Sequence, residues 1–204
     1  GAMVERLNTD DSVHGIIVQL PLADPAGTDE IVNMIAPDKD VDGLGDTAAY
    51  VSATATAIDW LLAGYNVDLK NKKIALVGNG RLVGKPLAAL WQTTGYDVSV
   101  YDDTTEDLAT VLRGAQVIVT ATGMPGIITE HMLQPSAVVV DAGTATENGK
   151  VVGDVAASVR DRDDLTITPE KGGVGPLTVA ALFDAVIQAA RKVADARESD
   201  DSDQ

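Results

Sequence analysis

The chain has 204 residues, of which 45% are hydrophobic and only 3% aromatic, and it contains no cysteine. A chain of this length can bury one or two hydrophobic cores, and the composition excludes a disulfide scaffold and a wholly disordered protein. The formal net charge of −16 argues against nucleic acid or an anionic membrane surface as a partner.

The net charge has two interpretations. The simpler one is a solvated acidic surface, followed by an acidic tail at residues 198–204 that we expect to be disordered. The other is adaptation to a cytoplasm of high salt concentration. We leave Gly1-Ala2-Met3, which is typical of tag removal, out of the fold, and because no signal peptide follows it we expect a cytoplasmic protein. No apolar run reaches the ~20 residues of a membrane span.

The N-terminal part combines apolar and polar stretches. Residues 15–18 are apolar and predict a short strand. Gln19 follows this strand directly, at the edge where open α/β sheets bind ligands. A helix is predicted from residue 28, then a polar loop at 37–43 with three aspartates, whose simplest interpretation is turn chemistry. A second helix is predicted at 54–62.

A glycine-rich turn follows the apolar run 74–77, which we expect to be a buried parallel strand. The turn has the pattern Gly78-x-Gly80-x-x-x-Gly84 and leads into a helix. Such a turn lets the backbone approach a pyrophosphate, which the amides at the helix start can bind. The third glycine comes one residue later than in the commonest dinucleotide fingerprint, so a merely tight turn is the competing interpretation.

Three further strands are predicted at 96–101, 116–121 and 137–141, separated by helical stretches. Asp102 ends the first of them, 24 residues after Gly78, close to the ~20 residues expected for an acidic group that binds the adenosine ribose. This alternation predicts an α/β fold with a Rossmann-like, doubly wound parallel sheet and a reduced second α/β lobe.

The last part contains short extended pieces at 150–154 and 165–168, a glycine-rich loop and a long helix at 176–197. The loop, Gly172-Gly-Val-Gly-Pro176, is either a ligand-binding segment or a simple helix entry. The two histidines, His14 and His131, show no metal-binding spacing, and we expect no metal.

Six motifs, in this order and spacing, resemble the bifunctional methylenetetrahydrofolate dehydrogenase/cyclohydrolase family. They are Val13-His-Gly-Ile-Ile-Val-Gln-Leu-Pro-Leu22, Pro37-Asp-Lys-Asp-Val-Asp-Gly43, Val83-Gly-Lys-Pro86, Thr122-Gly-Met-Pro125, Val152-Gly-Asp154 and Gly172-Gly-Val-Gly-Pro-Leu-Thr178. The first, second and last are specific to the family.

The resemblance implies two lobes. Residues 4–60 and 176–197 would form a partial folate lobe, and residues 61–175 a dinucleotide-binding domain. The family oxidises methylenetetrahydrofolate by hydride transfer to a nicotinamide and then hydrolyses the methenyl product to formyltetrahydrofolate. It is typically homodimeric through its nucleotide lobe.

The resemblance also implies site residues. Gln19 and Asp42 match the family's active-site glutamine and pterin-binding aspartate, and both would serve catalysis. The residues expected beside the folate are Gln19, Pro21, Asp42, Gly172, Gly173 and Pro176. The residues expected to bind the nucleotide are Gly78, Asn79, Gly80, Arg81, Gly84, Asp102, Thr122, Gly123 and Pro125.

The sequence departs from the family in ways that matter for chemistry. The family's Tyr-x-x-x-Lys motif, whose lysine serves the cyclohydrolase step, has no counterpart before His14, so that step is in doubt. The usual Gly-Arg-Ser of the turn is Gly78-Asn79-Gly80, and the usual His-Ser-Arg-Thr is Asp102-Asp103-Thr104-Thr105. An aspartate there repels a 2′-phosphate, so we predict NAD in preference to NADP, with Arg81 as the nearby cation that could bind the phosphate.

Three functions stay open at this point. The first is a dehydrogenase that lacks cyclohydrolase activity. The second is a non-catalytic remnant of the family that binds nucleotide or dimerises. The third is another Rossmann dehydrogenase, for example one like shikimate dehydrogenase.

Overall fold

The computed structural model describes residues 1–147 and 149–202 and divides into two compact units. Unit 1 comprises residues 1–53 and 178–204, and unit 2 comprises residues 54–177. Helix α3 (Ala53–Gly64) belongs almost wholly to unit 2, because Ala55, Ala57, Ile58 and Leu62 are part of its buried core. The first unit boundary therefore lies earlier than the sequence-based boundary at residues 60 and 61.

Unit 2 is built on a five-stranded sheet with the order β2-β1-β3-β4-β7, in which all neighbours are parallel. The strands are β1 (Lys73–Val77), β2 (Asp97–Tyr101), β3 (Val117–Thr120), β4 (Val138–Asp141) and β7 (Thr166–Ile167). The central strands β1 and β3 are buried almost throughout. This explains their continuous apolar sequences, because a parallel sheet is covered on both faces.

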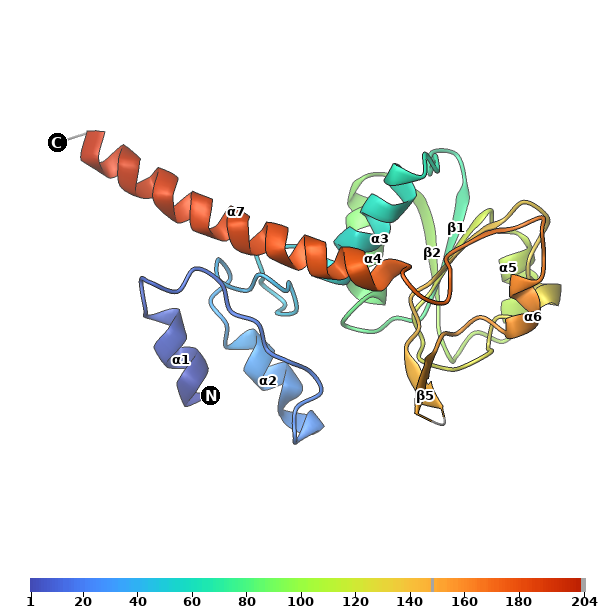
Figure 1. The fold of residues 1–204 in the computed structure, drawn as a ribbon, viewed down its shortest axis with the longest axis horizontal. Coiled ribbons are helices and arrows are strands. Elements are labelled where there is room, and N and C mark those ends of the chain that lie inside the picture. The colour runs from blue at the N-terminus through green and yellow to red at the C-terminus, as the bar shows by residue number, and fades with distance from the viewer. Residues whose placement is uncertain (148, 203–204) are drawn as a thin grey trace. The chain divides into compact units, whose positions relative to one another are not determined.

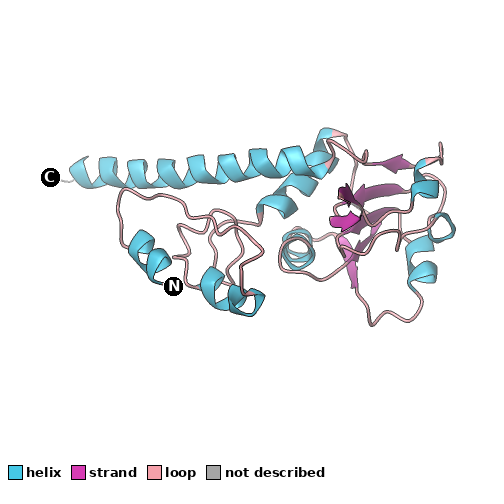
Figure 2. Cartoon of the chain, turned by 60° about the horizontal axis from the view of Figure 1, so that its bottom comes forward, coloured by secondary structure: helices cyan, strands magenta, loops and turns pink. Residues whose placement is uncertain are grey.

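Helices cover both faces of this sheet (Figures 1 and 2). Helices α3 and α4 (Gly84–Thr93) pack with Ile74, Leu76 and Val119 on one face. Helices α5 (Leu108–Arg113) and α6 (Ala157–Arg160) pack on the other, where Leu112 and Val159 join the core of Ala75, Val77 and Ile118. The predicted doubly wound α/β fold is confirmed. A short hairpin of β5 (Ala145–Glu147) and β6 (Lys150–Val152) and the turn η2 (Glu130–Met132) complete the unit.

Unit 1 contains α1 (Ala2–Asn8), η1 (Pro25–Gly27), α2 (Thr28–Asn33) and most of α7 (Val174–Ser202). The strand predicted at residues 15–18 is wrong. Only Ile16 makes a bridge, with Asp40 in parallel orientation. A strand needs a ladder of partners, and within the described residues no segment extends this pairing. Gly15 nevertheless lies tightly on Val41, since a Cβ atom there would come within 2.9 Å of the Val41 Cγ1.

Helix α7 is longer than the predicted 176–197. It continues through Ser202, so the expected disorder is wrong for residues 198–202, while residues 203–204 lie outside the described chain. Adding residues to an existing helix costs far less than starting one, which explains the extension. By length and composition alone, Val174–Ser199 is the one described helix that could cross a membrane, a test that helices of soluble proteins also pass.

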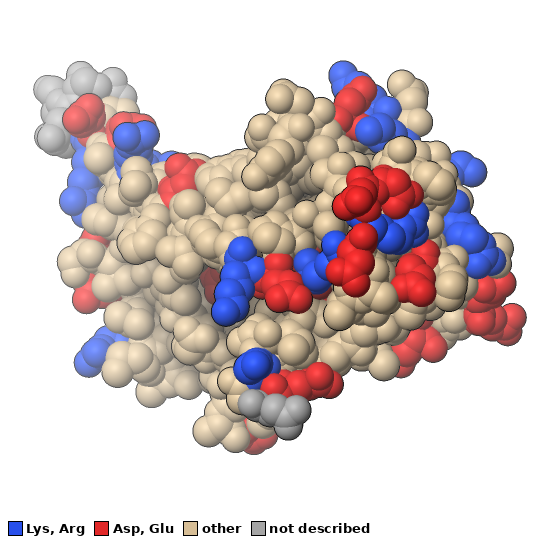
Figure 3. All heavy atoms as spheres, turned by 45° about the vertical axis from the view of Figure 1, so that its right-hand side comes forward, with Lys and Arg blue, Asp and Glu red and all other residues tan. Residues whose placement is uncertain are grey.

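The charged side chains do not separate into fields on the face shown in Figure 3, where acidic and basic residues are interspersed. Several are paired locally. Arg162 Nη2 lies 2.6 Å from Asp164 Oδ2, and this pair is partly exposed. On this face, therefore, the acidic groups are not gathered into one patch.

Candidate functional site

The carboxyl ends of the central strands meet at one edge of the unit 2 sheet. Gly78 N donates to Tyr101 O at 2.7 Å, Ala121 N to Val77 O at 2.8 Å, and Ala142 N to Thr120 O at 2.8 Å. The segments that follow β2, β1, β3 and β4 are thus neighbours. Because β2 and β3 flank β1 on opposite sides, this edge contains the point where the strand order reverses, the usual binding position in open α/β sheets.

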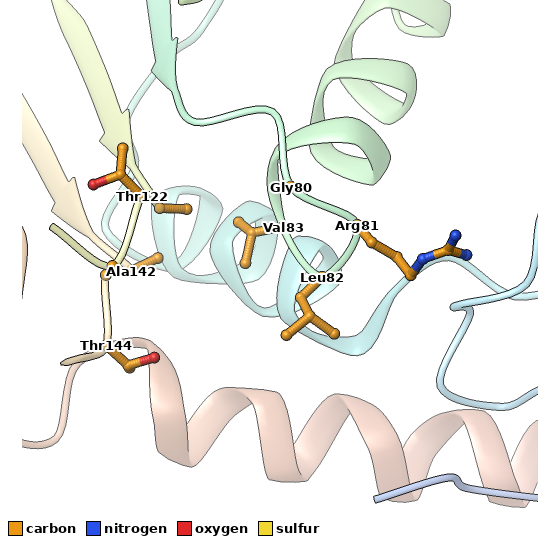
Figure 4. A pocket seen from close by; sticks show the side chains of 10 residues that line it. Gly80, Arg81, Leu82, Val83, Thr122, Ala142 and Thr144 are labelled. Carbon is orange, nitrogen blue, oxygen red and sulfur yellow. The ribbon is translucent and has the colours of Figure 1, made fainter. Parts of the chain in front are cut away.

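A hollow of about 280 Å³ lies at this reversal point (Figure 4). Its walls come from the glycine turn after β1 and from the loops after β3 and β4. The lining residues are Gly80, Arg81, Leu82, Val83, Ala121, Thr122, Gly123, Ala142, Gly143 and Thr144. The volume lies near the lower end of the ~300–1,000 Å³ typical of small-molecule sites, so the hollow suits part of a dinucleotide.

The three glycines of the turn have different tasks. A Cβ on Gly84 would overlap the carbonyl oxygen of Gly78, and a Cβ on Gly78, whose φ is +103°, would lie 2.5 Å from Ala121 O. These two glycines let the backbone close on itself. Gly80 has no atom within 4 Å of where its Cβ would be, and it lines the hollow. The closed backbone turn, with open space at Gly80, fits the approach of a pyrophosphate. The geometry of the turn is therefore compatible with the expected dinucleotide.

The other predicted nucleotide residues divide between the hollow and its surroundings. Thr122, Gly123 and Arg81 line it. The Arg81 side chain extends away from Thr122, Ala142 and Thr144 in Figure 4. Asn79 and Pro125 are exposed and do not line the hollow.

Asp102 lies just beyond β2, where it closes a turn. Its Oδ1 accepts hydrogen bonds from Thr104 Oγ1 at 2.6 Å and Thr104 N at 3.0 Å. These bonds hold the pKa of the exposed carboxyl below its ordinary value of 3.8, with the Thr104 hydroxyl as the larger cause. Among the described contacts Oδ2 is not engaged, so it can accept from a ribose hydroxyl.

Sequence reasoning missed two buried carboxylates behind the hollow, Asp141 and Asp154. Asp154 is fully buried and accepts from Thr120 Oγ1, Thr122 N and Met124 N. Asp141 forms an ion pair with Arg160 at 2.8 Å. The signal for Asp154 in the sequence is the Val-Gly-Asp motif that ends at this residue.

Unit 1 holds three of the predicted folate residues, Gln19, Pro21 and Asp42. Because the bridge between Ile16 and Asp40 is parallel, Gln19 and Asp42 both follow it on the same side. Gln19 is exposed and its Nε2 donates to the Leu20 carbonyl at 2.9 Å. Pro21 is exposed and follows a cis peptide bond.

The aspartates of the loop at 37–43 have separate roles. Asp40 is buried and accepts from Gly43 N at 3.0 Å and Gly45 N at 2.7 Å, so it shapes the loop. Asp42 is half-buried, and within the described residues its carboxylate accepts no hydrogen bond. Burial raises its pKa above 3.8, and the charge of Asp40 raises it further. A carboxylate perturbed in this way and left without a partner is a candidate binding group.

The loop before α7 belongs to unit 2. Gly172 is exposed with a φ of +79°, and a Cβ on Gly173 would lie 3.3 Å from Pro169 O. Pro176 lies exposed in the first turn of α7. Across the described part of the chain, no group of three or more His, Cys, Asp or Glu side chains is arranged to hold a metal ion.

Comparison with protein families gives two matches along the chain. The NAD(P)-binding domain of tetrahydrofolate dehydrogenase/cyclohydrolase matches residues 52–194, and the catalytic domain of the same family matches residues 2–42. The bifunctional protein FolD of Lactobacillus acidophilus is 39% identical over 199 residues, which cover 93% of this chain and 70% of that protein. FolD of a Hydrogenobaculum species is 39% identical over 88% of this chain and 69% of its own.

Solved structures give the same picture. The bifunctional enzyme FolD of Campylobacter jejuni superposes with a TM-score of 0.86 at 36% identity, covering 94% of this chain and 72% of that one. The FolD of Trypanosoma brucei, solved in complex with NADP cofactor and an inhibitor, gives a TM-score of 0.83 at 31% identity, with 94% and 71% covered.

Proposed function

The chain belongs to the tetrahydrofolate dehydrogenase/cyclohydrolase family, and we propose that it oxidises methylenetetrahydrofolate to methenyltetrahydrofolate by hydride transfer to a nicotinamide dinucleotide. The relatives are bifunctional enzymes of folate one-carbon metabolism. A dehydrogenase like shikimate dehydrogenase is not favoured, because both family domains match in order along most of this chain.

The observation that supports the proposal most is the half-buried Asp42 carboxylate, which accepts no hydrogen bond within the described residues. A half-buried carboxylate without a partner in the protein can accept two hydrogen bonds from the aminopyrimidine edge of a pterin, and such charged, paired hydrogen bonds discriminate strongly between ligands. Asp40 uses both of its oxygens to shape the loop, which leaves Asp42 for the ligand. Gln19, on the same side of the parallel bridge, has an exposed amide that can contact the same substrate.

The dinucleotide supplies the hydride acceptor, and the protein binds and orients it. Gly80, Thr122 and Gly123 would hold the part of it that enters the hollow. Gly172, Gly173 and Pro176 are proposed to contact the folate.

Within this proposal NAD is preferred to NADP. Asp102 and Asp103 stand where the family has histidine and serine, and Thr104 where it has arginine, so this turn offers carboxylates to a ribose and no cation to a 2′-phosphate. Arg81 is the nearest candidate to bind a phosphate, but its side chain extends away from Thr122, Ala142 and Thr144 (Figure 4).

The relatives are named as bifunctional, with a cyclohydrolase activity beside the dehydrogenase activity. The chain covers 70% of the first relative named above, and we confine the proposal to the dehydrogenase step. The competing function is a family member that binds nucleotide without catalysis. Substrate turnover distinguishes the two directly.

The test follows the absorbance of reduced nicotinamide with methylenetetrahydrofolate and either NAD or NADP. Asp42→Asn should lower substrate affinity by about ten- to a hundredfold, because the amide places a donor where the substrate also donates. Asp38→Asn, an exposed change of equal charge in the same loop, should act like the unmodified protein. Nucleotide binding without turnover would support the non-catalytic alternative.

We also propose a homodimer in the cytoplasm, with no nucleic acid or membrane partner. The homodimer rests on the family resemblance, the location on a composition without cysteine, and the exclusion of nucleic acid on the charge of −16. Light scattering coupled to gel filtration would measure the mass of the assembly, and a monomer at micromolar concentration would contradict the dimer.

A further inference from the structure

Two buried aspartates beside the hollow have no part in the function proposed above. Asp154 has no exposed surface, and the Asp141 side chain is 3% exposed. Carboxylates are rarely buried without charged or hydrogen-bonding partners, because desolvation strongly disfavours the ionised form. Their partners therefore indicate what these residues hold in place.

Asp154 fastens the loop that follows β3. Its Oδ2 accepts from Thr122 N at 2.6 Å and from Thr120 Oγ1 at 2.7 Å, and its Oδ1 accepts from Met124 N at 3.0 Å. Both oxygens are thus in use. Gly123, which lines the hollow, lies between the two backbone donors.

Asp141 fastens the loop that follows β4 and, at the same time, the backbone of Asp154. Its Oδ1 accepts from Gly143 N at 3.1 Å and Asp154 N at 3.0 Å. Its Oδ2 accepts from Val155 N at 3.2 Å and from Arg160 Nη2 at 2.8 Å. The contacts therefore run without a break from Arg160 on α6 through both carboxylates to Thr122.

The backbone packs closely against both carboxylates. A Cβ on Gly143 would overlap the carboxyl group of Asp154, and a Cβ on Gly153 would overlap that of Asp141. Gly143 itself lines the hollow, so the Asp154 carboxylate lies directly behind the wall. Thr122, Ala142 and Thr144 form that side of the hollow in Figure 4.

We propose that Asp141 and Asp154 are positioning residues that fix the two loops of this wall before the nicotinamide dinucleotide binds. The inference rests on the proposed nucleotide binding. A wall that is ordered in advance spares the ligand the entropy of ordering it. Without the carboxylates, the loops at 122–124 and 142–144 must be ordered by the ligand, which lowers affinity.

The decisive variant is Asp154→Asn. Because both oxygens of Asp154 accept, an amide must turn its NH2 group toward one of the donors. We expect dissociation constants for NAD and NADP to rise about ten- to a hundredfold, with a larger effect on the nucleotide KM than on kcat. Amide hydrogen exchange at Thr122 and Met124, measured without nucleotide, should accelerate while β1 remains protected.

Asp59→Asn is the matched control. Asp59 accepts only from Trp91 Nε1, through Oδ1 at 2.8 Å among the described contacts, so an asparagine can keep this bond, and nucleotide affinity should not change. The measurement is made below the melting temperature of both proteins. If Asp154→Asn and the unmodified protein then bind the nucleotides with dissociation constants within twofold of each other, the inference is overturned. Failure of the unmodified protein to bind either nucleotide would instead remove the proposed function on which it rests.

A second variant covers the case in which Asp154→Asn does not fold. Arg160 is partly accessible, with 17% of its side chain exposed, and it does not line the hollow. Arg160→Gln removes the cation from Asp141 and should weaken nucleotide binding severalfold in the same direction. A lower melting temperature with unchanged affinity would show a merely structural role and contradict the proposal.

Discussion

The α-carbon of Gly84 packs directly against the carbonyl oxygen of Gly78, and this contact closes the turn between β1 and α4. An added Cβ would overlap that oxygen. The two glycines are therefore joined by a requirement of the backbone, while a Cβ on Gly80 between them would meet nothing within 4 Å. The glycine pattern thus contains two kinds of position, and substitution can separate them.

Gly84→Ala should destabilise the protein by about 3 kcal/mol, because the methyl group forces the turn apart. Gly80→Ala should change the free energy of unfolding by less than about 0.5 kcal/mol. Urea unfolding of both variants measures the difference. Equal destabilisation would show that the turn relaxes around a side chain at either position.

Asp42 should make stability depend on pH in a definite direction. Its pKa is raised in the folded protein by burial and then by the charge of Asp40, so the folded state holds the proton more tightly than the unfolded state. Stability from this group is therefore fully present below the ordinary pKa of 3.8 and is lost as pH rises through the raised value.

Asp42→Asn, the variant that should weaken substrate binding, is accordingly expected to be more stable than the unmodified protein at neutral pH. The difference should close below pH 3.8. Thermal melting of both proteins between pH 3 and pH 8 measures it. A variant that is less stable at pH 7 would mean that the carboxylate has a stabilising partner.

Asp102 should set the choice of nucleotide. Asp102→Asn removes a charge that repels a 2′-phosphate, so the ratio of the NADP to the NAD dissociation constant should fall about three- to tenfold, and less at high salt. Isothermal titration with both nucleotides measures the ratio. Tighter binding of NADP than NAD by the unmodified protein would contradict the preference itself.

The net charge of −16 should make stability depend on salt. Screening of mutual repulsion should raise the melting temperature between low and molar salt, by about 2–4 °C for each kcal/mol of repulsion removed. The melting temperature is measured in potassium chloride and, as a control, in a neutral osmolyte of equal osmolality. The osmolyte does not screen charges, so the difference between the two isolates the effect of screening. A melting temperature that does not rise with the salt concentration would contradict both the mutual repulsion and the hypothesis of salt adaptation.

The sequence predicted those parts of the fold whose structure is decided by a short run of neighbouring residues. The buried strands β1, β3 and β4 and the turn at Gly78 are apparent in the order of residues, because buried parallel strands are continuously apolar. The strand at residues 15–18 was wrong because strand formation depends on a distant partner, and only Ile16 finds one. The helical state of residues 198–202 depends on the long helix that precedes them.

The site shows the same division. Gly80, Thr122 and Gly123 could be predicted because they belong to motifs at strand ends, and they do line the hollow. Asp141 and Asp154 could not be assigned a role, because their donors lie on segments up to 34 residues away. Asp40 and Asp42 look alike in sequence, and only their burial and hydrogen bonds distinguish the loop-forming residue from the candidate ligand.

The open space at Gly80 also affects how this family can diversify. Where the family usually has serine, this chain has glycine, and nothing in the protein occupies the vacated volume. Evolution can therefore exchange side chains at this position without passing through an unstable intermediate, since only a ligand would sense the change. In the proposed nucleotide site, single substitutions at Gly80 would therefore be able to change the nucleotide preference, while Gly78 and Gly84 stay fixed by the backbone that they close.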